Sequence, residues 1–415
     1  MSHARIGRFL DERKPETPCL VVDTAVVRER VHEFAAEFGR AALRYAVKAN
    51  PEPAVLRAVL AAGGGFDVAS PAEIDACLAV GAPPESLSYG NPVKKAADVG
   101  YAYSRGVRDF TTDAETDVDN LARFAPGSAV SVRLVVDAPL SATPFGGKFG
   151  CEPAHAVALL RRADRLGLDP AGIVFHVGSQ QTDASAWDSG IAAAAKVFAE
   201  FGAGGRNRPW RLNLGGGFAV SYTSPAPSTA DYARAIFTAL RAHFPGEGPA
   251  LMLEPGRAIV GAAGLIRTEV VLVAERAGQR WVYLDIGRYN GLAETENEAI
   301  PYRFALTGHR AENDGGARGP VVIAGPTCDG DDVLYRHTPY ELPLSLRAGD
   351  RLDILNTGAY TASYSSVAFN GIEPLRTYCL SDRHCLSDQH CLSDRHCLSD
   401  QHCLSDQHRR SDRLP

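Results

Sequence analysis

The sequence predicts an α/β protein in which a (β/α)8 barrel of the TIM type is followed by an all-β C-terminal domain. From about Leu43 to Glu254, short β-type runs alternate with segments whose apolar residues recur three and four positions apart, as in a parallel sheet built from βα units. After Gly261, β-type runs follow one another with only Gly, Pro and Asn turns between them. This second pattern indicates a separate β domain.

Eight β-type runs can be counted in the first region, and eight parallel strands close into a barrel. In chain order we predict these strands at residues 43–48, 65–69, 86–90, 108–112, 130–136, 172–177, 211–214 and 251–254. Apolar periodicity predicts outer helices between them, most clearly at 158–168 and 186–201. The β domain is expected to use the runs at 266–275, 280–286, 320–325 and 350–355, with the early run at 19–23 pairing into it.

The chain is therefore expected to have four parts: an N-terminal segment at 1–40, the barrel at 41–260, the β domain at 261–378 and a tail at 379–415. The tail repeats the unit CLSD[RQ]H five times. A six-residue period of mostly polar residues fits neither helix nor strand, so we predict a disordered segment. Its recurring Cys and His are only a weak sign of metal binding, and no metal site is predicted.

Composition excludes several functions. The net charge of -6 offers no basic surface for nucleic acid, and no stretch approaches the roughly 18 apolar residues of a membrane span. The N-terminus lacks an apolar signal core, so we expect a cytoplasmic protein. Five of the nine cysteines belong to the tail repeat, and the other four are interpreted as thiols rather than a disulfide framework.

Lys48 is the first candidate for chemistry. The chain has only six lysines, and this one closes the first predicted barrel strand. The carboxyl ends of barrel strands form active sites, and a lysine held there can act as a nucleophile. On position alone, however, a lysine that extends from a strand end into solvent is the more common interpretation.

Two late strand ends favour the functional interpretation. Gly215, Gly216 and Gly217 follow one strand directly, and a loop without side chains can bring backbone N–H groups to a phosphate, although most glycine runs are only tight turns. The next strand ends in EPGR, which places Glu254 at the barrel mouth. A carboxylate there can hold a proton on a pyridine nitrogen, and its ordinary alternative is a capping or salt-bridging role.

Further polar residues follow at other strand ends and turns. His176 could cover the face of a flat cofactor, although a lone strand histidine is usually structural. In GPTCDGDD, Cys328 is suited to donate a proton and Asp329 to neutralise a substrate ammonium. The ordinary alternative for this pair is a buried cysteine beside a turn-capping aspartate. Tyr360 could bond a phosphate and Phe369 could form an apolar wall.

The chain resembles the fold-type III pyridoxal-phosphate (PLP)-dependent ornithine/lysine decarboxylases, with their alanine-racemase-like barrel. The resemblance runs from about Thr17 to Tyr378, and the tail has no counterpart in the family. It rests on seven motifs in the family's order: YAVKAN, FDVASPAEI, FHVGSQ, LNLGGGF, EPGR, GPTCDGDDVLY and GAYTASYSSVAFNG.

The resemblance implies pyridoxal 5'-phosphate as cofactor and a homodimer whose two active sites are shared between subunits. The implied catalytic residues are Lys48, Glu254, His176 and, from the partner subunit, Cys328. The implied cofactor-binding residues are Lys48, Asp67, His176, Ser179, Gly215, Gly216, Gly217, Glu254, Gly256, Arg257 and Tyr360. The implied substrate-binding residues are Asp329, Asp285 and Phe369, of which Asp285 is the only acid available in YLDIGRYNGL.

The implied activity is decarboxylation of a basic L-amino acid, best assigned as L-ornithine to putrescine in polyamine biosynthesis. Lysine, or both lysine and ornithine, is the alternative, since one methylene changes binding by only about 1–3 kcal/mol. A diaminopimelate decarboxylase is disfavoured because Asp329 would repel a second carboxylate. A non-catalytic regulatory homologue is disfavoured because Lys48, Glu254 and Cys328 are all present. In TPFGGKFG, the arginine that often precedes KFG in the family is missing.

Overall fold

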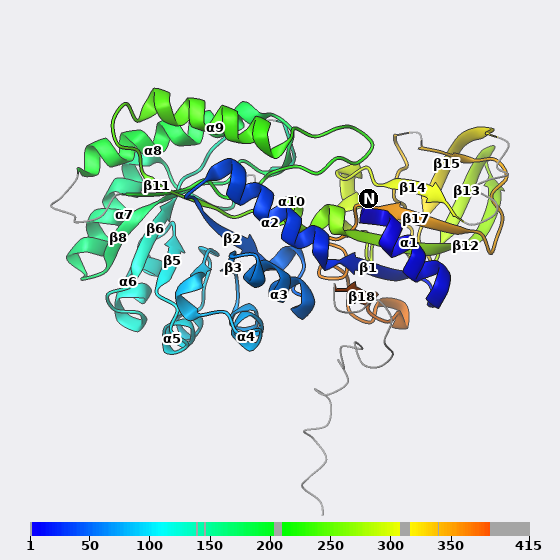
Figure 1. Ribbon diagram of the computed structural model, residues 1–415, viewed down its shortest axis with the longest axis horizontal. Helices are drawn as coiled ribbons and strands as arrows, with labels where there is room; N and C mark the ends of the chain where they lie inside the picture. The colour runs from blue at the N-terminus through cyan, green and yellow to red at the C-terminus, as the bar shows by residue number, and fades with distance from the viewer. Residues whose placement is uncertain are drawn as a thin grey trace, which may run out of the picture.

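Eight parallel strands close into a barrel, and a mixed β sheet lies beside it (Figure 1). The structure is a computed structural model, and it describes residues 2–137, 140–144, 147–202, 210–307, 316–338 and 340–381. The predicted (β/α)8 barrel followed by a β domain is confirmed. The predicted disordered tail was placed from residue 379, but Cys379 and Leu380 lie at the end of a strand, Arg376–Leu380, and from residue 382 onward the tail lies outside the described residues.

The barrel strands pair in the closed order β10-β11-β2-β3-β4-β5-β6-β8. They are β2 (Ala42–Ala46), β3 (Gly65–Val68), β4 (Leu87–Tyr89), β5 (Asp109–Thr112), β6 (Ala129–Arg133), β8 (Asp169–Val174), β10 (Arg211–Asn213) and β11 (Ala250–Leu253). All eight overlap the predicted strands, which are short runs between amphipathic segments.

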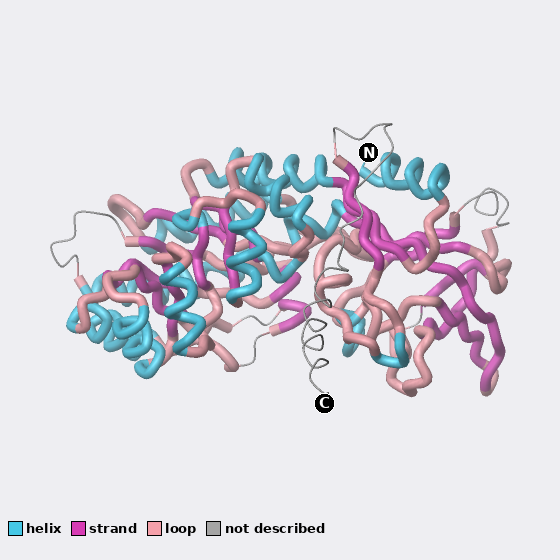
Figure 2. Tube along the Cα trace, turned by 90° about the horizontal axis from the view of Figure 1, so that it is seen from below, coloured by secondary structure: helices cyan, strands magenta, loops and turns pink. Residues whose placement is uncertain are grey.

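Helices surround the barrel on the outside (Figure 2). They are α2 (Thr24–Phe38), α3 (Pro53–Ala61), α4 (Pro71–Ala79), α5 (Ala96–Ser104), α6 (Glu115–Phe124), α7 (Pro153–Arg165), α8 (Trp187–Phe201), α9 (Thr229–His243) and the short α10 (Arg257–Val260). Local chemistry defines their starts. Asp23 and Ser70 each accept a hydrogen bond from a first-turn N–H, and Ser228 with Asp231 forms a reciprocal capping box at α9.

The β domain is an eight-stranded mixed sheet. It contains β12 (Gly264–Arg276), β13 (Gln279–Leu284), β14 (Arg303–Leu306), β15 (Arg318–Ala324), β16 (Tyr340–Pro343), β17 (Arg351–Leu355), β18 (Arg376–Leu380) and the early strand β1 (Cys19–Asp23). β1 lies between β12, to which it is antiparallel, and β18, to which it is parallel. Helix α1 (Ser2–Arg13) packs against β1, and a two-stranded ribbon of β7 (Ser141–Thr143) and β9 (Ser179–Gln181) lies apart from both sheets.

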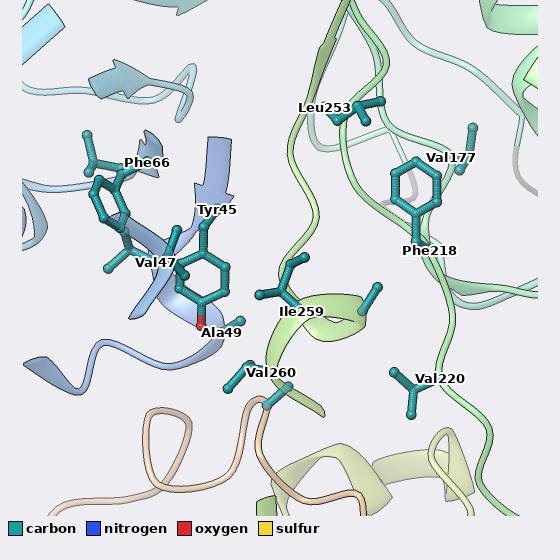
Figure 3. Packing of buried hydrophobic residues seen from close by; sticks show 14 of the residues in the cluster. Tyr45, Val47, Ala49, Phe66, Val177, Phe218, Val220, Leu253, Ile259 and Val260 are labelled. Atoms are coloured by element: carbon teal, nitrogen blue, oxygen red, sulfur yellow. The ribbon is translucent and has the colours of Figure 1, made fainter. Parts of the chain in front are cut away.

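The hydrophobic core continues from the barrel into the β domain. Figure 3 shows Tyr45, Val47 and Ala49 packed near Ile259 and Val260 of α10. The turn that follows β2, at residues 47–49, is therefore packed against α10. In the part of the chain that is described, no helix is both long and apolar enough to cross a bilayer.

Candidate active site

Lys48 lies in a single 3-10 turn, η1 (Val47–Ala49), directly after β2. Hydrogen bonds hold this turn between the two domains: Tyr360 N–H donates to Ala49 O at 2.8 Å, and Asn50 Nδ2 donates to Gly358 O at 2.9 Å. Because Val47 and Ala49 are buried, the lysine side chain alone is left to project from the turn.

Lys48 projects into a cavity of about 260 Å³ at the carboxyl ends of the barrel strands. Several of the predicted site residues line the same cavity, which contains Ala46, Lys48, Asp67, Thr143, His176, Ser179, Gln180, Gly216, Gly217, Phe218, Glu254, Gly256, Arg257, Glu294, Tyr360 and Tyr364. Residues from five barrel strand ends, from the β7 and β9 ribbon and from the β domain therefore meet at one place.

Burial and the neighbouring charges change the pKa of Lys48 in opposite directions. Burial on its own would lower the pKa of the Lys48 ammonium, but Tyr360, Asp67 and Glu254 outweigh burial and raise that pKa. Burial raises the pKa of the Asp67 carboxyl well above its ordinary value, and the charge of Glu254 adds to the rise. Burial also raises the pKa of Glu254, although Asn213 Nδ2 donates to Glu254 Oε1 at 2.5 Å.

His176 is neutral. Burial, together with the nearby cations Arg133 and Lys48, holds the pKa of its imidazole well below the ordinary value. Gly178 N–H donates to His176 Nδ1 at 3.0 Å, so the ring proton belongs on Nε2. An uncharged ring in a cavity wall is suited to stacking on a flat aromatic ligand.

The glycine loop passes close to His176 and Glu254 without room for side chains. A Cβ on Gly215 would lie 2.2 Å from Phe175 O, and one on Gly216 would lie 2.6 Å from Glu254 O. Among the described residues, the N–H groups of Gly216 and Gly217 donate to no protein acceptor, whereas that of Gly215 donates to Asn213. Gly215 therefore shapes the loop, while Gly216 and Gly217 line the cavity.

Arg257 is the centre of a buried polar cluster. Its guanidinium donates to both oxygens of Glu294, at 2.5 and 2.7 Å, and also to Ser179 Oγ and Tyr222 Oη. The Tyr360 ring lies 4.9 Å from the guanidinium carbon. Burial opposes the charge, but the neighbouring Tyr222 and Glu294 outweigh burial and raise the pKa of Arg257 well above its ordinary value.

The cavity fits pyridoxal phosphate. Arg257 Nε is a buried donor and Asp67 Oδ1 a buried acceptor, and within the described part of the chain neither has a hydrogen-bond partner. The Gly216 and Gly217 N–H groups are available as further donors. An amine, a buried carboxylate pair and a set of anion-binding donors thus face one space, which is the set that this cofactor requires.

The structure places Cys328, Asp329 and Phe369 elsewhere. Cys328 and Asp329 are exposed on the turn after β15, and none of the three lines the cavity of Lys48. They form a second cluster with Tyr289 and Asn370. Tyr289 Oη donates to Asp329 Oδ1 at 3.1 Å, and the Tyr289 and Phe369 rings pack 4.7 Å apart.

Asp285 does not reach either cluster. Its Oδ1 accepts from Thr268 Oγ1 at 2.5 Å and from Glu269 N–H at 3.0 Å, which ties β12 to the end of β13. Sequence reasoning missed Glu294, which lies in an acidic turn that resembles an ordinary surface segment. It also missed Arg133, which is close enough to Glu254 and Asp67 for their charges to raise its pKa, although burial outweighs them and lowers that pKa. Its place at the end of β6 was the available signal.

The barrel, the lysine at its first strand end and the anion-binding cluster define an enzyme that uses pyridoxal phosphate. A model of the family "Pyridoxal-dependent decarboxylase, pyridoxal binding domain" matches residues 24–261. The chain is 33% identical over 377 residues to a lysine/ornithine decarboxylase of Selenomonas ruminantium, covering 91% of this chain and 92% of the relative. It is 32% identical over 371 residues to a chloroplastic ornithine decarboxylase of Nicotiana glutinosa, covering 88% and 83%.

Solved structures agree. The fold matches that of SrLDC in complex with PLP and cadaverine with a TM-score of 0.80 and 32% identity, covering 91% of this chain and 94% of the other. It matches a lysine/ornithine decarboxylase of Vibrio vulnificus complexed with putrescine with a TM-score of 0.79 and 28% identity, covering 91% and 98%. The chain belongs to the fold-type III PLP-dependent ornithine/lysine decarboxylase family. It is a PLP-dependent carboxy-lyase.

Proposed function

We propose that this enzyme decarboxylates a basic L-amino acid and that its preferred substrate is L-ornithine, giving putrescine. The observation that carries the proposal is the convergence of Lys48, Glu254 and Arg257 on one cavity. Relatives named for ornithine and for lysine/ornithine support the substrate class. The exposed carboxylate of Asp329, beside the Cys328 thiol, supplies the negative charge that a distal ammonium needs.

Each cavity residue then has a role. Lys48 Nζ would hold the cofactor covalently, with Asp67 beside it, and Glu254 would keep a proton on the pyridine nitrogen. The neutral His176 ring would cover one face. The phosphate would be bound by Ser179, Gly216, Gly217, Gly256, Arg257 and Tyr360, with Gly215 setting the shape of the loop.

When bound, pyridoxal phosphate supplies an electron sink for the pair left behind by the departing carboxylate. The protein must then return a proton to the substrate Cα. Cys328 is the proposed donor, and positioned acid catalysis of this kind contributes roughly 100 to 10,000-fold in rate. Asp329 would hold the distal ammonium, and Phe369 would line the apolar part of the pocket.

Because Cys328 and Asp329 lie outside the cavity of their own chain, we propose a homodimer in which each subunit completes the other's site. Tyr364, Val367 and Phe369 are exposed apolar side chains on the segment before Asn370, and we propose that the partner subunit covers them.

A substrate panel tests the proposal. CO2 release should be highest with ornithine, lower with lysine by about 10- to 200-fold in kcat/KM, and negligible with diaminopimelate. Comparable rates on ornithine and lysine would identify a dual enzyme, and no release from any of ornithine, lysine or arginine would refute the proposal.

Covalent attachment is tested separately. Purified protein with added cofactor should show the visible absorption band of a lysine-bound aldehyde. Lys48→Ala should abolish the band, whereas Lys196→Ala, at an exposed helix position, should keep it. A band that survives in Lys48→Ala would show that another residue holds the cofactor.

A further inference from the structure

Asn370 makes two hydrogen bonds to one residue, Cys328. The Cys328 backbone N–H donates to Asn370 Oδ1 at 3.1 Å, and Asn370 Nδ2 donates to Cys328 Sγ at 3.3 Å. The first bond determines the second. A backbone N–H can only donate, so it must face the amide oxygen, which leaves the amide NH2 facing the sulfur.

The backbone around Asn370 holds it in this position. Asn370 lies in the 3-10 turn η6 (Phe369–Gly371) with φ of +53°, and Ala368 before it has φ of +56°. Asparagine adopts this left-handed region more readily than most residues, whereas alanine does so at a steric cost. The neighbouring Phe369 ring packs on Tyr289, so the turn is fixed from two sides.

We infer that Asn370 is a positioning residue for the proton donor of the proposed reaction. Its NH2 group occupies an acceptor site on Cys328 sulfur, which turns the S–H proton away from the amide and toward the space in front of the turn. When that proton passes to the substrate Cα, the sulfur is left as a thiolate. The Asn370 donor then stabilises the thiolate until a proton from solvent restores the thiol.

The role of Asn370 can be tested by substitution, because the charged groups near the Cys328 thiol belong to other residues. Asp329 and Asp331 lie on the same turn, Arg288 donates to Asp331 O and pairs with Glu296 at 3.5 Å, and Tyr289 bonds Asp329. A substitution confined to the Asn370 side chain leaves all of these groups in place.

The sharpest variant is Asn370→Asp, which keeps the shape and the acceptor for Cys328 N–H but replaces the donor to sulfur with an anion. The measurement is the rate of alkylation of Cys328 by iodoacetamide against pH, read by peptide mass spectrometry on the cofactor-loaded protein. We expect the midpoint to rise by about one pH unit, so that alkylation at pH 7 is about tenfold slower.

Asn297→Asp is the matched control, because Asn297 is also exposed with φ of +50° and lies in a different turn, η5 (Ala293–Glu298). Its alkylation profile should equal the wild-type profile. Asn370→Ala removes both the donor to sulfur and the acceptor of Cys328 N–H but adds no charge. It should shift the midpoint in the same direction by less, which keeps the test valid if Asn370→Asp does not fold. Wild-type alkylation profiles in both Asn370 variants would overturn the inference.

The catalytic meaning of the inference rests on the proposed function, but the thiol measurement does not. If the wild-type enzyme releases no CO2 while the Asn370 variants still shift the alkylation profile, the function fails and the positioning role stands. If CO2 is released and the profiles are unchanged, only the positioning role fails. Where both hold, the pH profile of kcat should shift in Asn370→Asp with the alkylation midpoint.

Discussion

Asp67 and Glu254 are two carboxyl groups that line the same cavity as Lys48. Burial raises the pKa of each carboxyl, and the charge of Glu254 raises that of Asp67 further. Asp67 Oδ1 has no hydrogen-bond partner among the described residues, and Gly90 lies so close to it that a Cβ there would be 2.0 Å away. Such groups destabilise the folded state and mark a site that is built for ligand binding.

This predicts that Asp67→Asn stabilises the apoprotein at neutral pH. A folded-state pKa above the unfolded value means that the Asp67 contribution is favourable below about pH 4 and is lost as the pH rises through the folded-state pKa. The gain should be about 1 kcal/mol or more at pH 7 and should vanish in acid. Urea unfolding of both proteins at several pH values measures it. Asp164→Asn, at an exposed position, should change little.

Single residues were predictable from the sequence where they stand at strand ends. Lys48, His176 and Glu254 each follow a run that could be recognised as a barrel strand. Asp285 was selected because it was the only acid in its motif, but its partners Thr268 and Glu269 lie on another strand, and local sequence does not show such a long-range pairing. Glu294 was missed for the same reason, since its partner Arg257 is distant in sequence.

At the scale of elements, the loop after β10 depends on its neighbour β11. Leu214 N–H donates to Met252 O, and Glu254 N–H donates to Gly215 O at 2.9 Å. The glycine loop and the strand end that carries Glu254 are therefore one hydrogen-bonded unit, and a change in the loop should move both the phosphate donors and the carboxylate.

We therefore expect Gly216→Ala to weaken cofactor binding. The added Cβ would meet Glu254 O at 2.6 Å and His176 Nε2 at 3.1 Å, and both must shift. Strain of this kind typically costs about 1–3 kcal/mol, so the Kd for pyridoxal phosphate should rise by about 10- to 100-fold. Absorbance titration measures the Kd. Gly246→Ala is the control, because a Cβ there meets nothing within 4 Å, and equal affinities in the two variants would contradict the expectation.

Elements were predictable where burial leaves a periodic signal. All eight barrel strands were found because parallel strands are apolar runs between amphipathic helices. The ribbon of β7 and β9 was not predicted. Its strands are three residues each, polar, and about 40 positions apart, so neither has a pattern of its own.

At the scale of the molecule, the proposed reaction needs two clusters that are separate within one chain, because Cys328, Asp329 and Phe369 do not line the cavity of Lys48. Lys48 is in the cavity, and Cys328 is on the exposed turn. A chain alone would then bind the cofactor but could not complete the proposed proton transfer, so activity should depend on association.

Mixing two inactive variants tests this dependence. After subunit exchange between Lys48→Ala and Cys328→Ala, half of the dimers are hybrids, and each has one intact site of two. Activity should recover to about a quarter of the wild-type value. A mixture that remains as inactive as its components, despite demonstrated exchange, would rule out shared sites.

The pairing of β1 with β18 has a consequence for how the protein is made. Cys19 pairs with Arg376 and Asp23 with Leu380. Strand β1 is synthesised early, but it cannot pair with β18 until residues 376–380 have been synthesised. The last barrel strand ends at Leu253, so all barrel strands leave the ribosome before β18 does. The sheet beside the barrel therefore has an open edge until residue 380 has emerged. Nascent chains that stall before that point would expose this edge, which makes them natural clients for chaperones.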